Sequence, residues 1–246
     1  MGTLLLQLVG PMQSWGVQSH FTHRDTGLEP SKSGVIGLVC AALGKPRDEN
    51  HPDNVCKPSL EQLAKLRMGV RVDREGLIQC DYHTANNVMK AGGKPFVGLK
   101  ETELSDRFYL ADAAFLVGLE SDDGNLLSRL DESLQHPVWM LYLGRKAFVP
   151  SVPVWLKDGL KLEQDLETAL RSYPRIANPR RQQLNAETQL YEARMMLDDA
   201  EQGSIVRPDQ PVSFVKGNRK HMDRRIRATF YVLPEAQEDS LCTFQN

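Results

Sequence analysis

The stretch that decides the fold runs from Leu4 to Gly44, beginning with LLLQLVGPMQSWG at positions 4–16 and ending with SKSGVIGLVCAALG at positions 31–44. The first six residues are apolar except Gln7, which predicts a strand covered on at least one face. Gly10-Pro11 is expected to end this strand, because proline cannot donate to a sheet ladder. The small and apolar residues at 34–43 predict a buried helix that ends at Gly44. A strand, a long loop and a buried helix are therefore expected here.

The start of this helix has the chemistry of an anion site. Ser31 or Ser33 can cap the helix, and its first turn offers free backbone N–H groups, two hydroxyls and the ammonium of Lys32. A nucleotide P-loop would need glycines where Thr26 and Ser31 stand, so an ATPase or GTPase is not expected. The plainer interpretation is that Lys32 is a solvated residue beside a helix cap.

Composition indicates an ordinary protein of one domain, or of one domain with a small second one. The chain has 246 residues, of which 41% are hydrophobic and 25% charged, enough to bury a sizeable core. It contains no run of 18 apolar residues and no basic start typical of a secretory signal, so no membrane partner is expected. The cysteines at 40, 56, 80 and 242 are widely spaced, which predicts neither a disulfide framework nor a zinc site and favours a cytoplasmic location.

The formal net charge of −2 hides a segregation of charge along the chain. Acidic residues gather at 120–132, 198–201 and 235–239, whereas positions 207–227 hold seven basic residues and two acidic ones. The basic residues are Arg207, Lys216, Arg219, Lys220, Arg224, Arg225 and Arg227. A protein with one basic face can bind a polyanion and still be near neutral. Alternatively, this run is simply the solvated face of a strand or helix.

Hydrophobic periodicity predicts the remaining elements. The expected helices lie at 60–66, capped by Ser59, and at 123–135. The expected strands lie at 68–73 (half-buried), continued across a turn by 77–82, and at 108–119 and 139–146. With the short helix set aside, the order is βαββαβ, which predicts an α+β protein with a ferredoxin-like (RRM-like) domain at 1–150. A helix at 161–172 and strands at 213–215 and 227–232 predict a smaller C-terminal lobe at 151–246, whose topology the pattern does not define.

Residues 84–107 lack core periodicity, and so long a stretch inside a compact domain is either functional or disordered. We expect it to be an insertion in the ferredoxin-like domain.

Four segments resemble, in the same order, the CasD family, the subunits of type I-E CRISPR Cascade complexes that hold the 5′ end of the guide RNA. The similar segments lie at 10–44, at 81–84 (DYHT), at 107–115 and at 142–146 (YLGRK), and together they span over half the chain. The resemblance implies an RNA-binding protein of the RAMP superfamily that caps the 5′ handle of the crRNA in antiviral defence. It also implies that 84–107 forms a thumb that touches the guide RNA and a backbone subunit, and that the protein bridges the backbone and large subunits.

RNA binding is expected through loops and helix ends, because the strand at 4–9 offers no outward aromatic residues on which bases could stack. Gly144-Arg145-Lys146 resembles the glycine-rich loop of this group, in which glycine lets the backbone approach a phosphate. The expected RNA-binding residues are Met12, Gln13, Ser14, Trp15, Arg24, Lys32, Ser33, His83, Lys100, Arg107, Arg145 and Lys146.

The alternative function is a metal-independent endoribonuclease that processes the CRISPR precursor. Such an enzyme needs a general base and a general acid, and the residues that could supply them are His20, His23, Lys32, Tyr82 and His83. The motifs resemble the type I-E form, in which a separate subunit cleaves, so no catalytic residue and no cofactor are expected. The spacing of His20 and His23 suits a metal, but Asp25 is the only acidic residue close by in the sequence, and no metal site is expected.

Overall fold

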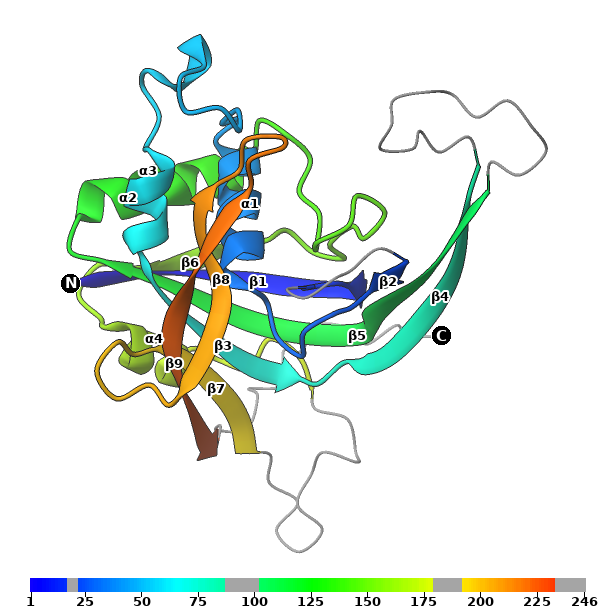
Figure 1. Cartoon of the computed structure of the whole chain (residues 1–246). Coiled ribbons are helices and arrows are strands. Elements are labelled where there is room, and N and C mark those ends of the chain that lie inside the picture. The colour runs from blue at the N-terminus through cyan, green and yellow to red at the C-terminus, as the bar shows by residue number, and fades with distance from the viewer. Residues whose placement is uncertain (17–21, 87–101, 179–191, 233–246) are drawn as a thin grey trace, which may run out of the picture.

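The computed structural model describes residues 1–16, 22–86, 102–178 and 192–232 of the chain. It is a mixed helix-and-sheet protein built on one large sheet, in which the strands follow the order β6-β1-β5-β3-β7-β9-β8 and both β2 and β4 pair with β5 (Figure 1). All of these pairings are antiparallel except β2–β5. The strands are β1 (Gly2–Gln13), β2 (His23–Arg24), β3 (Arg67–Arg74), β4 (Leu77–Ala85), β5 (Glu103–Ser121), β6 (Trp155–Lys161), β7 (Glu192–Asp198), β8 (Ile205–Ser213) and β9 (Lys220–Val232).

Helices cover both faces of this sheet. On one face lie α1 (Lys32–Ala42), α2 (Leu60–Lys65) and α3 (Gly124–Gln135), and on the other lies α4 (Leu166–Ser172) (Figure 1). The first strand serves both cores, because Leu4, Leu6 and Leu8 belong to the cluster around α1 and α3, whereas Leu5 packs with α4. The apolar run at 4–9 is therefore covered on both faces, as strands of such composition usually are.

The prediction that Gly10-Pro11 ends the first strand is wrong, since β1 continues to Gln13. Pro11 lies between the pairs Gly10–Ala113 and Met12–Ala111 of the β1–β5 ladder. Opposite this point, Asp112 has a φ of 55°, so the ladder is irregular there. Proline is tolerated in a strand at such irregularities.

The helix predicted at the end of the opening stretch is confirmed. Ser31 is the N-cap of α1, and its side chain accepts a hydrogen bond from the Gly34 N–H at 3.3 Å. After the helix, Gly44 has a φ of +60°, the left-handed conformation that favours glycine at a helix C-terminus. The helix at 60–66 is also confirmed and begins with a capping box between Ser59 and Gln62.

The strand at 68–73 is confirmed as β3, but it is buried on both faces rather than half-buried. Arg71 and Asp73, which point away from the apolar side, are fully buried and form an ion pair with Nε–Oδ1 at 2.6 Å. Arg71 also donates to the carbonyl oxygens of Leu170 and Tyr173 at the end of α4. The pattern suggested a solvated face because it could not show that α4 covers it.

The strand predicted at 139–146 is wrong, because these residues form a loop and the next strand is β6. No strand in the described part of the chain pairs with this segment, and Trp139 and Met140 remain 47% and 67% exposed. Gly144 adopts a φ of 95°, which bends the backbone out of the extended conformation. Leu143 N–H donates to the Phe148 carbonyl at 2.8 Å and closes the turn.

The strands predicted at 77–82 and 108–119 are confirmed as parts of β4 and β5, which extend together as a two-stranded arm (Figure 1). The predicted thumb begins and ends on these strands. Most of it, residues 87–101, lies outside the described part of the chain.

In the C-terminal part, the helix predicted at 161–172 is shorter and begins at Leu166. The strand predicted at 213–215 is wrong in position, since β8 ends at Ser213, whereas 227–232 lies within β9.

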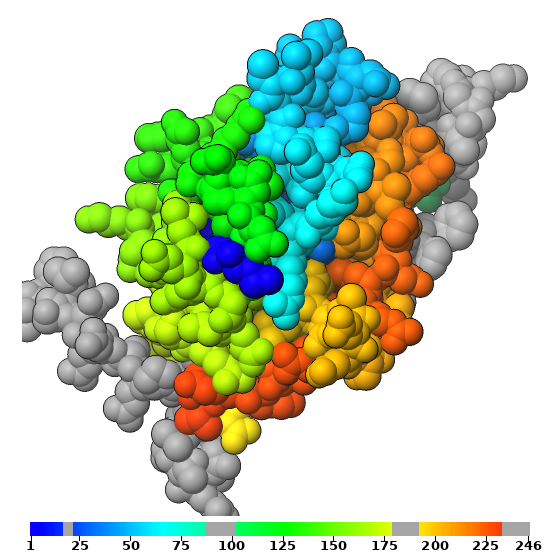
Figure 2. All heavy atoms as spheres, turned by 90° about the vertical axis from the view of Figure 1, so that its left-hand side faces the viewer, coloured from blue at the N-terminus to red at the C-terminus, as the bar shows by residue number. Residues whose placement is uncertain are grey.

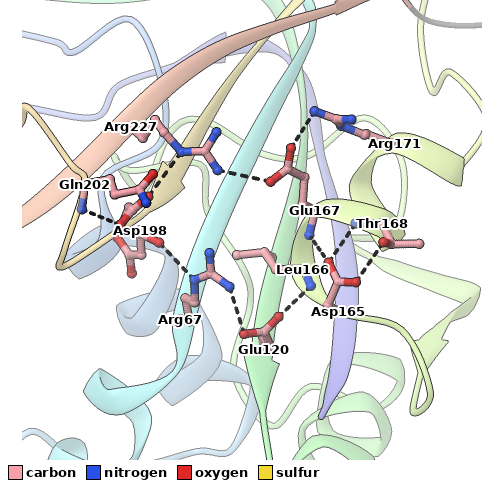
Figure 3. A network of polar contacts seen from close by, with 11 residues as sticks. Arg67, Glu120, Asp165, Leu166, Glu167, Thr168, Arg171, Asp198, Gln202 and Arg227 are labelled. Atoms are coloured by element: carbon pink, nitrogen blue, oxygen red, sulfur yellow. Dashed lines mark hydrogen bonds and ion pairs between the residues drawn. The ribbon is translucent and has the colours of Figure 1, made fainter.

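Polar contacts join the C-terminal part to the rest of the sheet. Arg67 of β3 donates to Glu120 and to the Asp198 carbonyl, while Arg227 of β9 pairs with Glu167 of α4 (Figure 3). On the face shown in Figure 2, the blue atoms of the chain's start lie between green and cyan atoms, with yellow-green atoms of the residues after position 150 below them. A separate lobe at 151–246 stays a prediction. No helix in the described part of the chain is long and apolar enough to span a membrane.

Candidate nucleic-acid interface

A cleft of about 670 Å³ lies beside the first turns of α1, between β5 and the loop that follows α3. It brings together seven of the residues predicted to bind RNA. These are Ser14, Trp15, Arg24, Ser33, Arg107, Arg145 and Lys146. They come from five different segments of the chain, and the fold alone makes them neighbours.

The wall of the cleft near β1 is a close contact between two loops. Ser14 N–H donates to the Leu143 carbonyl at 3.1 Å, and Ser14 Oγ contacts the Phe108 carbonyl at 3.3 Å. A Cβ at Gly144 would come within 1.9 Å of the Ser14 carbonyl oxygen. Only glycine fits there. Gly144 was predicted to let the backbone approach a phosphate, and in the structure it lets two segments of the protein's own backbone approach each other.

The Trp15 side chain packs beneath this wall of the cleft. This side chain is only 2% exposed, and a Cβ at Gly34 would lie 2.9 Å from the indole, so the ring packs directly on the first turn of α1. Its Nε1–H donates to Gln13 Oε1 at 3.1 Å. Gln13 in turn donates to the carbonyls of Leu8 and Ala113. This buried network fixes the direction in which the chain leaves β1.

The basic wall of the cleft is set by strand pairing. Arg24 of β2 stands opposite Arg107 of β5 in the parallel ladder. Arg145 Nη2 donates to the Phe108 carbonyl at 2.8 Å, and its guanidinium lies 5.4 Å from the centre of the Phe148 ring. Lys146 follows it and is exposed. Arg24, Arg107, Arg145 and Lys146 form no ion pair with a carboxylate of the described residues at salt-bridge distance, and we call them the basic wall.

The electrostatics of Arg145 show that these charges act on one another. Burial lowers the pKa of Arg145, and the nearby charges of Arg107 and Arg24 lower it further, although Asp81 and Asp25 act in the opposite direction. Guanidinium groups remain protonated at neutral pH, so the mutual repulsion raises the free energy of the empty cleft. A bound anion would relieve it.

Four of the described residues that were predicted to bind RNA do not line the cleft. Gln13 is part of the buried network, and Met12 packs against the hydrophobic core. His83 lies on the β4–β5 arm, with Nδ1 3.8 Å from Asp81 Oδ2. Lys100 lies outside the described residues.

Lys32 is the fourth of these, and the structure gives it a different role from the predicted one. Its side chain is buried, and Nζ lies 3.0 Å from Asp198 Oδ2. Its backbone N–H, at the start of α1, donates to Asp209 Oδ2 at 2.8 Å. The anion at this helix N-terminus is therefore a carboxylate of the protein itself. Desolvation lowers the pKa of Lys32, and Asp198 opposes this shift.

Sequence reasoning missed several residues of the cleft. Arg47, Arg219 and His221 line it, as do the side chains of Trp139 and Tyr142. The sequence does show two aromatic residues, Trp139 and Tyr142, close to Arg145, but its pattern predicts a strand there and not the wall of a cleft. Arg219 was recognised as basic, but its sequence position gives no reason to place it near Arg145.

Three of the described residues considered for ribonuclease chemistry lie on the two strands that pair with β5, and the fourth, Lys32, is held in a buried ion pair with Asp198. Tyr82 and His83 lie on β4, where Tyr82 stands opposite Asp106 of β5. His23 on β2 also stands opposite Asp106 and packs against the Phe108 ring at 4.9 Å. His20 lies outside the described residues. Among the described residues, no group of three or more His, Cys, Asp or Glu side chains could hold a metal ion.

Comparison with known proteins identifies the family. The model of the CRISPR-associated protein family Cas5 matches residues 3–227. A protein of Escherichia coli, CRISPR system Cascade subunit CasD, is 32% identical over 176 residues, which cover 69% of this chain and 76% of the relative.

Solved structures agree. A structure described as a crystal structure of Cas protein has 38% identity and a TM-score of 0.66 over 95% of both chains. A chain of a CRISPR RNA-guided surveillance complex has 31% identity and a TM-score of 0.72 over 95% of this chain and 91% of its own. The fold is thus that of a CRISPR-associated protein. Within that class, the chain belongs to the Cas5 family.

Proposed function

We propose that the protein is a noncatalytic RNA-binding subunit of a CRISPR surveillance complex and that its cleft holds the 5′ handle of the crRNA. The observation that carries this proposal is the basic wall, in which Arg24, Arg107, Arg145 and Lys146 converge without a paired carboxylate among the described residues. The similarity to CasD and to a chain of an RNA-guided surveillance complex supports it.

The cleft suits the backbone of a single strand better than a duplex or a small metabolite. Guanidinium groups bind phosphates through paired N–H donors, and each neutralised phosphate releases counterions. Ser14 and Ser33 line the same space as the basic wall. Trp139 and Tyr142 add aromatic surface on which an unpaired base can stack.

The arm and the fold suit an assembly role. The β4–β5 arm extends away from the body (Figure 1) and exposes Ile78 and Tyr82 at 54% and 64%. We propose that it reaches the backbone subunit of the complex, and that another face contacts the large subunit, in an assembly that works in the cytoplasm. The antiparallel order β6-β1-β5-β3, with α1 and α3 in the crossovers, supports a ferredoxin-like unit as its body.

The test of RNA binding uses the purified chain and a fluorescein-labelled, repeat-derived single-stranded RNA, followed by fluorescence anisotropy. Binding to wild type should weaken steeply between 50 and 200 mM salt, with a log–log slope of about 0.7 for each phosphate contact. The double variant Arg107→Ala/Arg145→Ala should lose about 1.4 units of this slope. Lys157→Ala is the matched control, since Lys157 is exposed on β6 and does not line the cleft. Affinity that is independent of salt, or equal losses in the control, would contradict the proposal.

The test of the noncatalytic role is the length of the guide RNA in cells. His83→Ala should leave it unchanged, because we expect a separate subunit to make the cut and because Lys32, the candidate lysine, is held by Asp198. Purified protein incubated with repeat RNA, with and without EDTA, should return the RNA intact. Accumulation of uncut precursor in the variant would favour the endoribonuclease instead.

A further inference from the structure

The basic run at 207–227 is divided by the structure into two parts. In the inner part, three arginines form ion pairs with carboxylates of other segments. Arg207 lies 2.6 Å from Glu29, Arg224 lies 2.6 Å from Asp209 and also pairs with Asp198, and Arg227 lies 3.1 Å from both Asp199 and Glu167. Their charges are matched within the protein, so they hold β8 and β9 in place rather than attract a ligand.

The outer part is the tip of the β8–β9 hairpin, residues 214–221, and its charges are not matched in this way. Lys216, Arg219 and Lys220 are exposed and form no ion pair with the described residues. Arg219 and His221 line the same cleft as the basic wall. Of the cations that the inner pairs leave over, Arg219 is thus the one that lines the cleft.

The tip is held in position by its base. Phe214 packs against the hydrophobic core around α1, and the turn closes with a hydrogen bond of 3.0 Å from Asn218 N–H to the Val215 carbonyl. Gly217 has a φ of 80°, which suits this tight turn. The tip therefore projects from an anchored hairpin, so little conformational entropy is lost when a ligand binds it.

A further arginine lies nearby on another segment. In Figure 1 the orange hairpin rises beside α1, and in Figure 2 its atoms touch the blue segment that follows α1. Arg47 belongs to that segment, is exposed and lines the cleft. The other cation there, Lys45, is already bound to Glu49 at 3.0 Å. Arg47 and Arg219 thus offer two further guanidinium groups at the cleft, besides the basic wall.

We propose that the hairpin tip, with Arg47, is a second phosphate-binding group of the cleft. This inference rests on the proposed function: a single strand of RNA held at the basic wall continues past Trp139 and Tyr142 and places later phosphates against Arg47 and Arg219. The contacts are to phosphates and not to base edges, so they add affinity without sequence preference. An RNA too short to reach the tip would bind at the basic wall alone.

The experiment compares Arg47→Ala/Arg219→Ala with Arg225→Ala. Arg225 is the matched control, because it is an exposed arginine of the same hairpin that lines a different hollow with Lys65 and Arg67. Binding of labelled single-stranded RNAs of about three and about ten nucleotides is measured against salt concentration. The double variant should bind the longer RNA about 10-fold more weakly, with a slope lower by about 0.7 for each lost contact, and equally so for different sequences. The short RNA should bind as to wild type.

The outcomes separate this inference from the proposed function. If Arg47→Ala/Arg219→Ala binds the longer RNA like the control, while Arg107→Ala/Arg145→Ala still loses affinity, the second group does not exist and the proposed function stands. If the variant of the basic wall also binds like wild type, the proposed function itself is wrong. Charge reversal by Arg219→Glu should weaken binding further than alanine does, and equal affinity would also overturn the inference.

Discussion

Asp198 is the residue on which the buried charges behind the cleft depend. Its carboxylate accepts from Lys32 Nζ at 3.0 Å and from the Met68 N–H at 2.9 Å, and it pairs with Arg224. The side chains of Lys32, Arg224 and Asp198 are only 5%, 11% and 13% exposed. Asp198→Ala would leave the buried ammonium of Lys32 without its nearest acceptor. It would also remove one of the two carboxylates that pair with Arg224, leaving Asp209.

The magnitude follows from the cost of an uncompensated buried charge. Removing one partner of a buried ion pair typically costs about 3–5 kcal/mol, against a total free energy of unfolding of about 5–15 kcal/mol. Solvent reaches Lys32 only slightly, so little screening reduces this cost. We therefore expect Asp198→Ala to lower the free energy of unfolding by about 3–5 kcal/mol.

The loss in free energy of unfolding that Asp198→Ala causes should depend on pH. Desolvation already lowers the pKa of Lys32 below its ordinary value, and Asp198 is the main group that raises it again. In Asp198→Ala the pKa of Lys32 falls further, so the unfolded chain binds more protons than the folded one over a wider pH range. Stability rises with pH wherever the unfolded state binds more protons. The variant should therefore regain part of its stability as the pH rises from neutral toward 10.5, the ordinary value for lysine.

Urea unfolding followed by circular dichroism measures both effects. The control is Glu61→Ala, which breaks the exposed pair of Glu61 with Lys65, whose side chains are 78% and 73% exposed. Exposed pairs contribute little, so the control should unfold at the wild-type midpoint. The reasoning is refuted if Asp198→Ala is as stable as the control, or if its deficit grows as the pH rises.

Three further predictions follow from single contacts. Gly144→Ala should lower the melting temperature and weaken RNA binding together, because its Cβ would overlap the Ser14 carbonyl oxygen at 1.9 Å; an unchanged anisotropy titration would contradict this. Trp15→Phe removes the donor to Gln13 Oε1 and should cost about 1–3 kcal/mol in urea unfolding. Arg71→Ala leaves a buried carboxylate unpaired and should cost about 3–5 kcal/mol by the same measurement, a loss that near-wild-type unfolding would exclude.

The elements that the sequence predicted correctly are those whose signals are local. The caps at Ser31 and Ser59 and the spacing of apolar residues that follows them depend only on neighbours within a turn of helix. The long apolar run of β5 is similarly unambiguous. The loop at 139–146 shows the limit of this reasoning, because its apolar residues satisfy a strand pattern, yet no strand among the described residues pairs with it. The true fourth strand of that region, β6, contains Lys157, Asp158 and Gly159 and carries no strand signal.

The candidate site divides in the same way. The basic wall was predicted because its residues belong to recognisable segments, whereas the second group at Arg47 and Arg219 was not, since nothing local distinguishes these arginines from others. The role of Lys32 was misjudged for the same reason. Its partners Asp198 and Asp209 lie 166 and 177 residues away in sequence, and only the sheet brings them to the start of α1.

The number of basic residues in a stretch of sequence therefore does not predict where a polyanion binds, because it does not show which of them are already paired with a carboxylate. The run at 207–227 and the segments at 24, 107 and 145 both contain arginines, yet the first supplies mostly internal ion pairs and the second supplies the basic wall. The two groups of arginines differ in whether the guanidinium forms an ion pair with a carboxylate of the protein. That pairing depends on contacts between strands that are distant in sequence. An arginine that the fold leaves without such a partner keeps its full attraction for phosphate, even in a protein whose net charge is −2. Binding that survives the loss of Arg107 and Arg145 but not of the internally paired Arg207 would show that this distinction fails.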